Sequence, residues 1–284
     1  MTNWRKGGIS KGPGRAPSET DATLEWARAA IQQGRADDAE RLVRNVLAGI
    51  PQHPTALHLL GCALLLQDRP GQALAPLEKA ARSRQDPEIE TQLAIALRKV
   101  GRTDDALARL DRATKRRPPF PAAFHELGFL LHSLDRSEEA IAVIERGAEL
   151  VPGAPELSVQ LGGIHHARRD LSKARAAYSQ ALAIAPDHAD AHYGAAVVLM
   201  DEGEFSQAAE HLRRSLAKHP ADVQARLKLG VCLLELGRSD DALGCLRTAI
   251  HRRPQLYGIV LRLVSSAARG RFWLRPSSAA KALR

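Results

Sequence analysis

The sequence contains little cysteine and few aromatic side chains. Its 284 residues include three cysteines, Cys62, Cys232 and Cys245, and only 4% of the residues are Phe, Trp or Tyr. An odd number of cysteines with no C-x-x-C pair indicates neither a disulfide framework nor a zinc site. We therefore expect a fold held together by apolar packing, with no disulfide, metal ion or other cofactor.

The chain also lacks any long apolar run. No stretch approaches the ~18 consecutive apolar residues that a membrane-spanning helix needs. Residues 1–19 contain no apolar segment of the kind found in secretory signals. These absences favour a cytosolic location. Because 44% of the residues are hydrophobic, disorder throughout the chain is excluded.

Acidic residues are fewer than basic ones, with 32 Asp and Glu against 41 Lys and Arg, and the formal charge is +9. Such a charge suggests nucleic acid, an anionic membrane or an acidic protein as a partner. The excess lies at the two ends. Residues 1–19 hold four basic residues and one acid, and residues 252–284 hold eight basic residues and no acid, whereas residues 20–251 hold 29 basic and 31 acidic residues. We therefore expect any anionic partner to bind at the ends.

What the sequence does contain is a repeat of about 34 residues. An alanine recurs seven times at this interval, at Ala39, Ala73, Ala106, Ala140, Ala174, Ala208 and Ala242. A small residue precedes each alanine by twelve positions, at Ala27, Gly61, Ala94, Gly128, Gly162, Ala196 and Gly230. A larger residue follows it by four positions, at Val43, Leu77, Leu110, Ile144, Tyr178, Leu212 and Leu246.

A proline closes six of the seven units, twelve positions after the alanine: Pro51, Pro118, Pro152, Pro186, Pro220 and Pro254. The second unit has Gln85 at this place and is one residue short. Within each half-unit the apolar positions fall at i, i+3, i+4 and i+7, which is one face of an α-helix. Each unit is therefore predicted to be two helices, with the proline ending the second helix. A Gly- or Asp-rich hinge is expected between the two helices, with glycine at Gly34, Gly101, Gly203 and Gly237.

These positions resemble those of the tetratricopeptide repeat (TPR), a 34-residue helix-turn-helix unit. The resemblance covers residues 20–256 as seven tandem units: 20–53, 54–86, 87–120, 121–154, 155–188, 189–222 and 223–256. It implies an all-α fold, a right-handed superhelical solenoid of tandem helix-turn-helix units. The sequence departs from the family early in the first helix, where an aromatic residue is expected and only Phe124 provides one.

Three segments lie outside the repeats. Residues 1–19 are rich in Gly, Pro, Ser and basic side chains and are predicted to be a disordered tail. Residues 257–270 continue the helical pattern and are predicted to be a helix that caps the exposed apolar face of the last repeat. Residues 271–284 are expected to form a basic aromatic tail that begins with the Phe-Trp-Leu segment 272–274.

Two kinds of charged cluster have both a chemical and a structural interpretation. Paired acids, which suit general acid–base catalysis, occur at Asp37-Asp38, Asp104-Asp105, Glu138-Glu139 and Asp240-Asp241. Their place just before the repeat alanine favours the first turn of the second helix instead, in three cases behind a capping Thr103, Ser137 or Ser239. Basic clusters that suit phosphate binding occur at Lys115-Arg116-Arg117 and Arg252-Arg253, but the end of a helix favours cations for its dipole.

Histidines provide no strong metal motif. The pairs are His165-His166 and His188 with His192, and no cysteine or further carboxylate has ligand spacing nearby. Ordinary surface or groove histidines are favoured. The sequence also contains no P-loop, no G-x-G-x-x-G, no G-x-S-x-G and no HExxH. We therefore expect no enzymatic activity.

The resemblance implies that the first helices line a concave groove that binds a peptide. The places it implies for contact are Leu24, Arg28, Ile31, His58, Cys62, Leu65, Leu66, Ile95, Arg98, Lys99, His125, Phe129, His132, Val159, His166, Tyr193, Val197, Met200, Leu227, Val231 and Leu234. This surface is largely apolar, which suits an amphipathic helix or an extended apolar segment. It carries neither the Lys and Asn clamp of chaperone-tail binders nor the asparagine ladder of glycosyltransferase arms. The alternative is that many of these side chains only pack between adjacent helices.

Together these features favour a non-enzymatic, cytosolic, bacterial scaffold that binds a protein or peptide of unknown identity. One alternative is a recognition arm for a glycosyl- or sulfotransferase that acts in trans. A weaker alternative is association of the basic termini with nucleic acid or an anionic membrane. The oligomeric state does not follow from the sequence.

Overall fold

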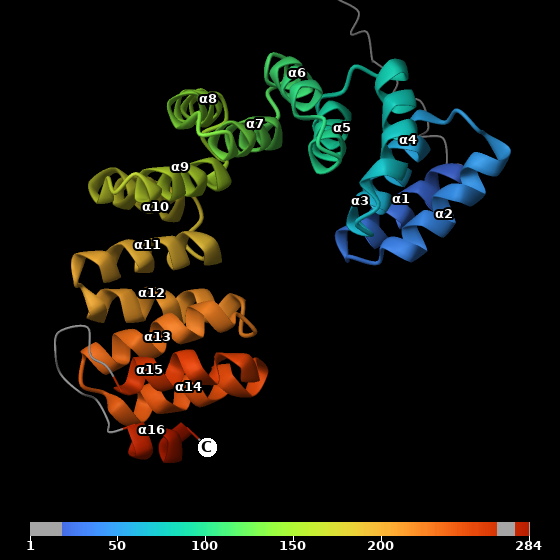
Figure 1. Ribbon diagram of the computed structural model, residues 1–284. Coiled ribbons are helices and arrows are strands. Elements are labelled where there is room, and N and C mark those ends of the chain that lie inside the picture. The colour runs from blue at the N-terminus through green and yellow to red at the C-terminus, as the bar shows by residue number, and fades with distance from the viewer. Residues whose placement is uncertain (1–18, 266–275, 284) are drawn as a thin grey trace, which may run out of the picture. The chain divides into compact units, whose positions relative to one another are not determined.

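The structure is a computed structural model that describes residues 19–265 and 276–283. Within these residues all regular secondary structure is helical, which confirms the predicted all-α fold (Figure 1). The repeats comprise α1 (Glu19–Gln32), α2 (Ala36–Gly49), α3 (Pro54–Leu66), α4 (Pro70–Ser83), α5 (Pro87–Lys99), α6 (Thr103–Thr114), α7 (Pro121–Ser133), α8 (Ser137–Leu150), α9 (Pro155–Ala167), α10 (Leu171–Ile184), α11 (Ala189–Glu202), α12 (Phe205–Lys218), α13 (Val223–Glu235) and α14 (Ser239–Arg252). A short 3-10 helix (Pro254–Leu256), α15 (Tyr257–Ser265) and α16 (Pro276–Leu283) follow.

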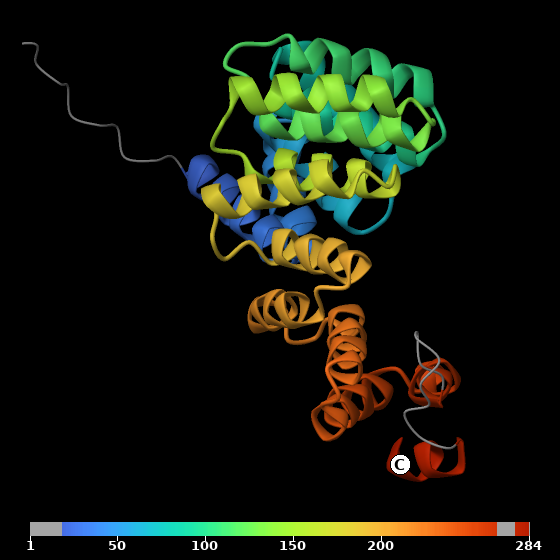
Figure 2. The same ribbon diagram turned by 90° about the vertical axis from the view of Figure 1, so that its left-hand side faces the viewer.

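The chain divides into two compact units, residues 1–116 and 117–284. In the first, each helix from α1 to α6 packs against the next, and α3 also contacts α1 and α5. In the second, each helix from α7 to α14 packs against the next, and α9 also contacts α7 and α11. Figure 2 shows this succession of hairpins from a second direction. Each unit is thus a solenoid of tandem helical hairpins.

Every hairpin turns at a residue in the left-handed region of the backbone. The four predicted hinge glycines, Gly34, Gly101, Gly203 and Gly237, have φ values of 71°, 81°, 84° and 73°. The other three hairpins place Asp68, Asp135 and Arg169 there, with φ values of 54°, 60° and 64°. A side chain makes this conformation unfavourable, so glycine suits the hinge and Arg169 strains it.

An arginine precedes the second helix in five units, and in four of them it pairs with an acid three residues later. The pairs are Arg35–Asp38, Arg102–Asp105, Arg136–Glu139 and Arg238–Asp241, with N–O distances of 3.5, 2.7, 2.7 and 2.6 Å. Each acid lies in the first helical turn, where the helix dipole favours negative charge, as predicted. The capping role expected of Thr103, Ser137 and Ser239 is wrong. These residues begin their helices, and an arginine occupies the capping position.

The two helices of a unit cross closely at the small residue of the repeat. A Cβ atom on Gly162 would lie 2.7 Å from the ring of Tyr178, and one on Gly230 would lie 2.7 Å from the side chain of Leu246. These contacts pair the small residue with the larger residue that follows the repeat alanine. Because Leu246 is fully buried, a side chain at Gly230 would displace it.

Two helices, rather than one, follow the last repeat. α15 begins at the start of the expected capping helix, and the rest of that helix lies outside the described residues, as does the Phe-Trp-Leu segment 272–274. The segment expected as a tail contains α16, which contacts α14 and α15. Leu283 of α16 is only 5% exposed and belongs to the same core cluster as Leu246 and Val264. Burial of this leucine stabilises the packing of α16 against the preceding helices.

Candidate functional site

The first helices of the first compact unit surround a cavity of about 290 Å³. Its lining comes from α1, α3 and α5: Arg28, Ile31, Gln32, His58, Leu59, Cys62, Leu65, Leu66, Glu88, Gln92, Ile95 and Lys99. Most of these residues occupy places that the resemblance assigns to the groove. The lining residues that hold these places are Arg28, Ile31, His58, Cys62, Leu65, Leu66, Ile95 and Lys99. We call this cavity the groove cavity.

The groove cavity combines apolar side chains with charges. Leu66 ends α3 with 52% of its surface exposed, and Ile95 is half-buried on α5. Arg28 and Lys99 provide two cations, against which Glu88 is the acid in the lining. The Nζ atom of Lys99 donates to Asp68 at 2.8 Å. An amphipathic segment with apolar anchors and an acidic side chain fits such a lining.

His58 is the most buried polar side chain of the groove cavity. It is only 5% exposed, and its burial lowers the pKa of the imidazole below its usual value, so the ring is neutral at pH 7. Its Nε2 atom has no hydrogen-bond partner among the described residues. Buried polar atoms are generally paired, so this nitrogen is a candidate contact for a bound group.

The cysteines lack the properties of nucleophiles. Burial raises the pKa of Cys62, in the groove cavity, to about 12, and it raises the pKa of Cys232 on α13 to about 12. A thiol acts as a nucleophile only as the thiolate, which is scarce at neutral pH for such a pKa. Cys62 and Cys232 are therefore present almost entirely as thiols at neutral pH.

In the second compact unit the groove places are distributed along α7, α9, α11 and α13. His125 lines a cavity of about 350 Å³ with Phe120, Pro121, Ala122, Glu156 and Leu157. Phe129 is 45% exposed, and Val159, Val197, Met200 and Val231 are half-buried. Three polar groove places have specific partners: His132 with Ser137 at 2.9 Å, His166 with Asp201 at 2.9 Å, and the Tyr193 ring with Lys228, whose Nζ is 6.0 Å from the ring centroid.

One groove place of the first compact unit lies outside the groove cavity. Arg98 on α5 is half-buried and does not line that cavity.

Four of the apolar groove places are buried in the core. Leu24, Leu65, Leu227 and Leu234 are 5%, 9%, 8% and 3% exposed. Leu227 and Leu234 belong to one core cluster with Leu246. Packing between helices, the alternative interpretation of these side chains, therefore accounts for their placement.

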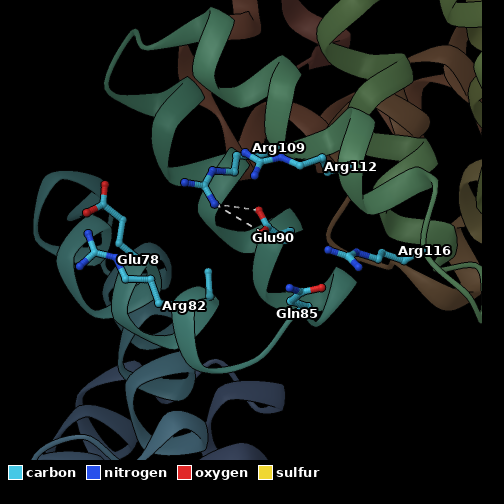
Figure 3. Close-up of a pocket in the computed structure, with 8 residues that line it drawn as sticks. Glu78, Arg82, Gln85, Glu90, Arg109, Arg112 and Arg116 are labelled. Carbon is cyan, nitrogen blue, oxygen red and sulfur yellow. Dashed lines mark hydrogen bonds and ion pairs between the residues drawn. The ribbon is translucent and has the colours of Figure 1, made fainter.

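A second cavity, of about 330 Å³, lies in the same compact unit and is lined by arginines (Figure 3). Its lining is Glu78, Ala81, Arg82, Gln85, Glu90, Arg109, Arg112 and Arg116. The carboxylate of Glu90, which is 7% exposed, accepts from Arg109 at 3.2 Å. We call this cavity the arginine pocket.

Sequence reasoning identified only Arg116 of these arginines, as part of a basic cluster. That cluster was expected in the last turn of α6, but α6 ends at Thr114, so Arg116 and Arg117 lie beyond the helix. The arginine pocket draws on residues from 78 to 116, so no local motif marks it. The sequence did contain a sign of this pocket, because the second unit is one residue short, with Gln85 in place of the proline, and the third unit has Glu90 and Arg109 at places that are mostly uncharged in the other units.

The histidines and paired acids form no recognisable reaction centre. Among the described residues no three His, Cys, Asp or Glu side chains are grouped as metal ligands. The Nδ1 atom of His188 accepts from the backbone N–H of Ala191 and so caps α11. His192 lies against His211, with 2.9 Å between their Nδ1 atoms, and its Nε2 lies 2.9 Å from the carbonyl oxygen of Pro186.

Comparison with protein families finds one described as Tetratricopeptide repeat. One model of that description matches residues 24–88, 91–155 and 193–257, and another matches residues 165–214. Comparison with curated protein sequences gives no match. No helix in the described part of the chain has the length and apolar character needed to cross a membrane.

Several solved structures are similar to this chain. The APC/C hetero-tetramer Cut9–Hcn1 contains a chain with 20% identity and a TM-score of 0.63, over 77% of this chain and 44% of that one. Pseudomonas aeruginosa pilF has 18% identity and a TM-score of 0.58, over 73% of this chain and 95% of that one. TTC0263, a TPR protein of Thermus thermophilus, has 24% identity and a TM-score of 0.54, over 64% of this chain and 99% of that one. At these identities the likeness shows the fold alone.

Proposed function

Because the chain belongs to the tetratricopeptide repeat family, we propose that it is a non-enzymatic scaffold that binds a segment of a partner protein in its groove. The observation that carries the proposal is the groove cavity, where eight of the implied contact places lie together between α1, α3 and α5. One of the similar structures belongs to a hetero-tetramer, which is consistent with a role in assembly.

The chemistry of the groove cavity suggests what the segment contains. Exposed Leu66 and half-buried Ile95 favour apolar anchors spaced along a helix or an extended strand. Arg28 and Lys99 provide polar contacts beside these anchors, although each cation already has an acid near it: Glu25 lies 3.8 Å from Arg28, and Asp68 lies 2.8 Å from Lys99. The unpaired Nε2 of His58 can accept or donate one hydrogen bond, according to its tautomer.

Selection from a displayed peptide library tests this proposal. The bait is the full chain, and the selected peptides are then titrated against it and against the double variant Leu66→Glu/Ile95→Glu. We expect the variant to weaken binding by about tenfold or more, since it puts two carboxylates where apolar anchors bind.

Ile50→Glu is the matched control, because Ile50 is also an exposed large apolar residue, at 46%, but lies outside the groove cavity. The far-ultraviolet circular dichroism of all three proteins should agree. Equal affinity of the groove variant and the unaltered chain would contradict binding in the groove cavity.

The alternatives receive no support from the described residues. The transferase-arm hypothesis points to the Phe-Trp-Leu segment 272–274, which lies outside them. The membrane and nucleic-acid hypothesis points to the basic termini, which lie largely outside them as well. The groove therefore remains the basis of the proposed function.

A further inference from the structure

The arginine pocket is separate from the groove cavity. The two cavities share helix α5 but no lining residue: Glu88, Gln92, Ile95 and Lys99 face the groove cavity, whereas Glu90 faces the arginine pocket. The remaining walls of the arginine pocket come from the second helices α4 and α6 and from the turns that follow them. The proposed peptide groove therefore leaves this pocket without a function.

The pocket lies where the second and third units depart from the repeat. Glu90 takes a place that the other units give to Thr23, Leu57, Phe124, Ser158, His192 and Arg226. Arg109 takes a place that the others give to Leu42, Pro76, Val143, Ala177, His211 and Cys245. Of the seven units, only the third combines an acid and an arginine at these two places. The second unit is also one residue short there and has Gln85 instead of proline, and Gln85 lines the pocket.

The charges of the pocket favour an anion. Its lining contains four arginines, Arg82, Arg109, Arg112 and Arg116, and two glutamates, so its formal charge is +2. This contrasts with residues 20–251 as a whole, which carry a slight negative charge. The distribution of charge at the level of the whole chain therefore conceals a local basic site.

The ion pair inside the pocket organises one of its arginines. Glu90 is 7% exposed and accepts from Arg109 at 3.2 and 3.4 Å, which fixes the position of the Arg109 guanidinium. The Nε atom of Arg112 donates to the carbonyl oxygen of Ala108 at 3.2 Å, one turn back in α6. Figure 3 shows Arg82 and Glu78 on the wall formed by α4, with Arg109, Arg112 and Arg116 on the other sides. The arginines of this lining come from α4, from α6 and from the turn after α6.

We propose that the arginine pocket binds a phosphate group, either inorganic phosphate or the phosphomonoester of a larger molecule. A phosphate dianion has three strong acceptor oxygens and is matched by the planar fork of arginine, which donates two parallel hydrogen bonds. The volume of about 330 Å³ accommodates a phosphate with a small group attached. No aromatic side chain lines the pocket, so it offers no stacking platform for the bases of a nucleic acid.

Titration calorimetry on the full chain in chloride buffer at low ionic strength tests this proposal. The probes are inorganic phosphate, a short peptide that contains phosphoserine, and the same peptide without the phosphate. The site variant is Arg82→Gln/Arg112→Gln, because both side chains are exposed and their loss leaves the Glu90–Arg109 pair intact. The control is Arg214→Gln, since Arg214 holds the same repeat place in the sixth unit as Arg112 does in the third.

We expect saturable binding of inorganic phosphate that the site variant weakens by about tenfold or more, because each lost guanidinium removes charge-assisted hydrogen bonds. The control variant should bind as the unaltered chain does. Tighter binding of the phosphopeptide than of phosphate would identify the source as a modified protein, and equal affinity would identify it as a free phosphate. An absence of saturable binding to both phosphate probes, or equal weakening by the site and control variants, would overturn the proposal. Circular dichroism confirms that the variants keep their helices, and the groove variant Leu66→Glu/Ile95→Glu should bind phosphate normally.

Discussion

The third and the sixth repeat units both have a polar pair at the same two places of the repeat, but the pair is charged in the third unit and neutral in the sixth. In the third unit these places hold Glu90 and Arg109, a charged pair with Arg109 partly exposed at the arginine pocket. In the sixth they hold His192 and His211, and His192 is only 2% exposed. The carbonyl of Pro186 can only accept, so Nε2 of His192 donates to it and Nδ1 of His192 accepts from His211.

The difference shows how a regular repeat acquires local chemistry. Both pairs place polar side chains where the second unit has Leu57 and Pro76, and neither pair leaves a buried polar atom of its own without a hydrogen-bond partner. The histidine pair is neutral and is satisfied within the protein. The Glu90–Arg109 pair is neutral as a whole, and the excess positive charge of the arginine pocket comes from Arg82, Arg112 and Arg116 against Glu78. The repeat framework thus accepts either kind of polar pair at these two places, and in the third unit the pair borders the arginine pocket.

The largest effect should come from breaking the charged pair of the third unit. Arg109→Met leaves the carboxylate of Glu90, which is 7% exposed, without its partner, and we expect a loss of about 3 kcal/mol in the free energy of unfolding. Urea unfolding followed by circular dichroism measures it.

The double variant Glu90→Leu/Arg109→Met is the internal control for that change. It gives these places the apolar character that Leu57 and Leu42 have in other units, and it should recover most of the lost stability. If Arg109→Met alone costs less than about 1 kcal/mol, the ion pair has little structural importance.

A smaller, pH-dependent effect should distinguish the histidine pair from the charged pair. Burial lowers the pKa of both His192 and His211, so the unfolded chain binds protons more readily than the folded one. The stabilisation from the neutral pair is present above the unfolded pKa of about 6.5 and is lost as the pH falls below it toward the lowered folded values. We expect the melting temperature of the unaltered chain to fall as the pH is lowered through that range. The melting temperature of the His211→Gln variant should fall less steeply over the same range. Identical slopes for both proteins would contradict the assignment.

The smallest effect is expected at the hinge between the two helices of a unit, where the fifth and sixth units have different residues. The sixth unit turns at Gly203 and the fifth at Arg169, both with positive φ. Arg169→Gly should raise the free energy of unfolding by about 0.5–1 kcal/mol because glycine adopts this conformation without steric cost. The variant also loses the exposed Arg169–Asp201 ion pair, whose N–O distance is 3.2 Å, and this loss offsets only a small part of the gain in stability. Thermal unfolding of the variant beside Gly203→Ala, expected to be destabilised, gives the comparison, and a destabilised Arg169→Gly would refute the hinge argument.

The periodic part of the fold was predictable from the sequence because each unit repeats the same solution. Spacing of the alanines placed the helix pairs, and the prolines marked their ends near the residues where the helices stop. The use of Arg35, Arg102, Arg136 and Arg238 before the second helices was not predicted. The usual capping residues accept hydrogen bonds, whereas these arginines act through an acid one turn later. α16 was missed as well, since its burial depends on a long-range contact of Leu283.

Of the two candidate sites, the repeat pattern indicated the groove cavity but not the arginine pocket. Arg28, Cys62 and Ile95 share one repeat place and His58 holds another, so the resemblance could gather these residues of the groove cavity. The repeat alone did not tell which of the leucines turn inward, because burial of Leu227 and Leu234 depends on packing with neighbouring helices. The arginine pocket has no shared place to reveal it. It depends on how residues from two successive units converge in space.

The high pKa of the buried thiols has a practical consequence for chemical labelling. Burial raises the pKa of Cys62 to about 12, so its side chain is almost entirely the un-ionised thiol at pH 7. The same holds for Cys232, and burial raises the pKa of Cys245 too. A cysteine introduced on an exposed helix face would ionise near the ordinary value of about 8.5 and react with a maleimide far faster than these three. A fluorescent reporter can therefore be attached at a chosen position while every native cysteine is retained.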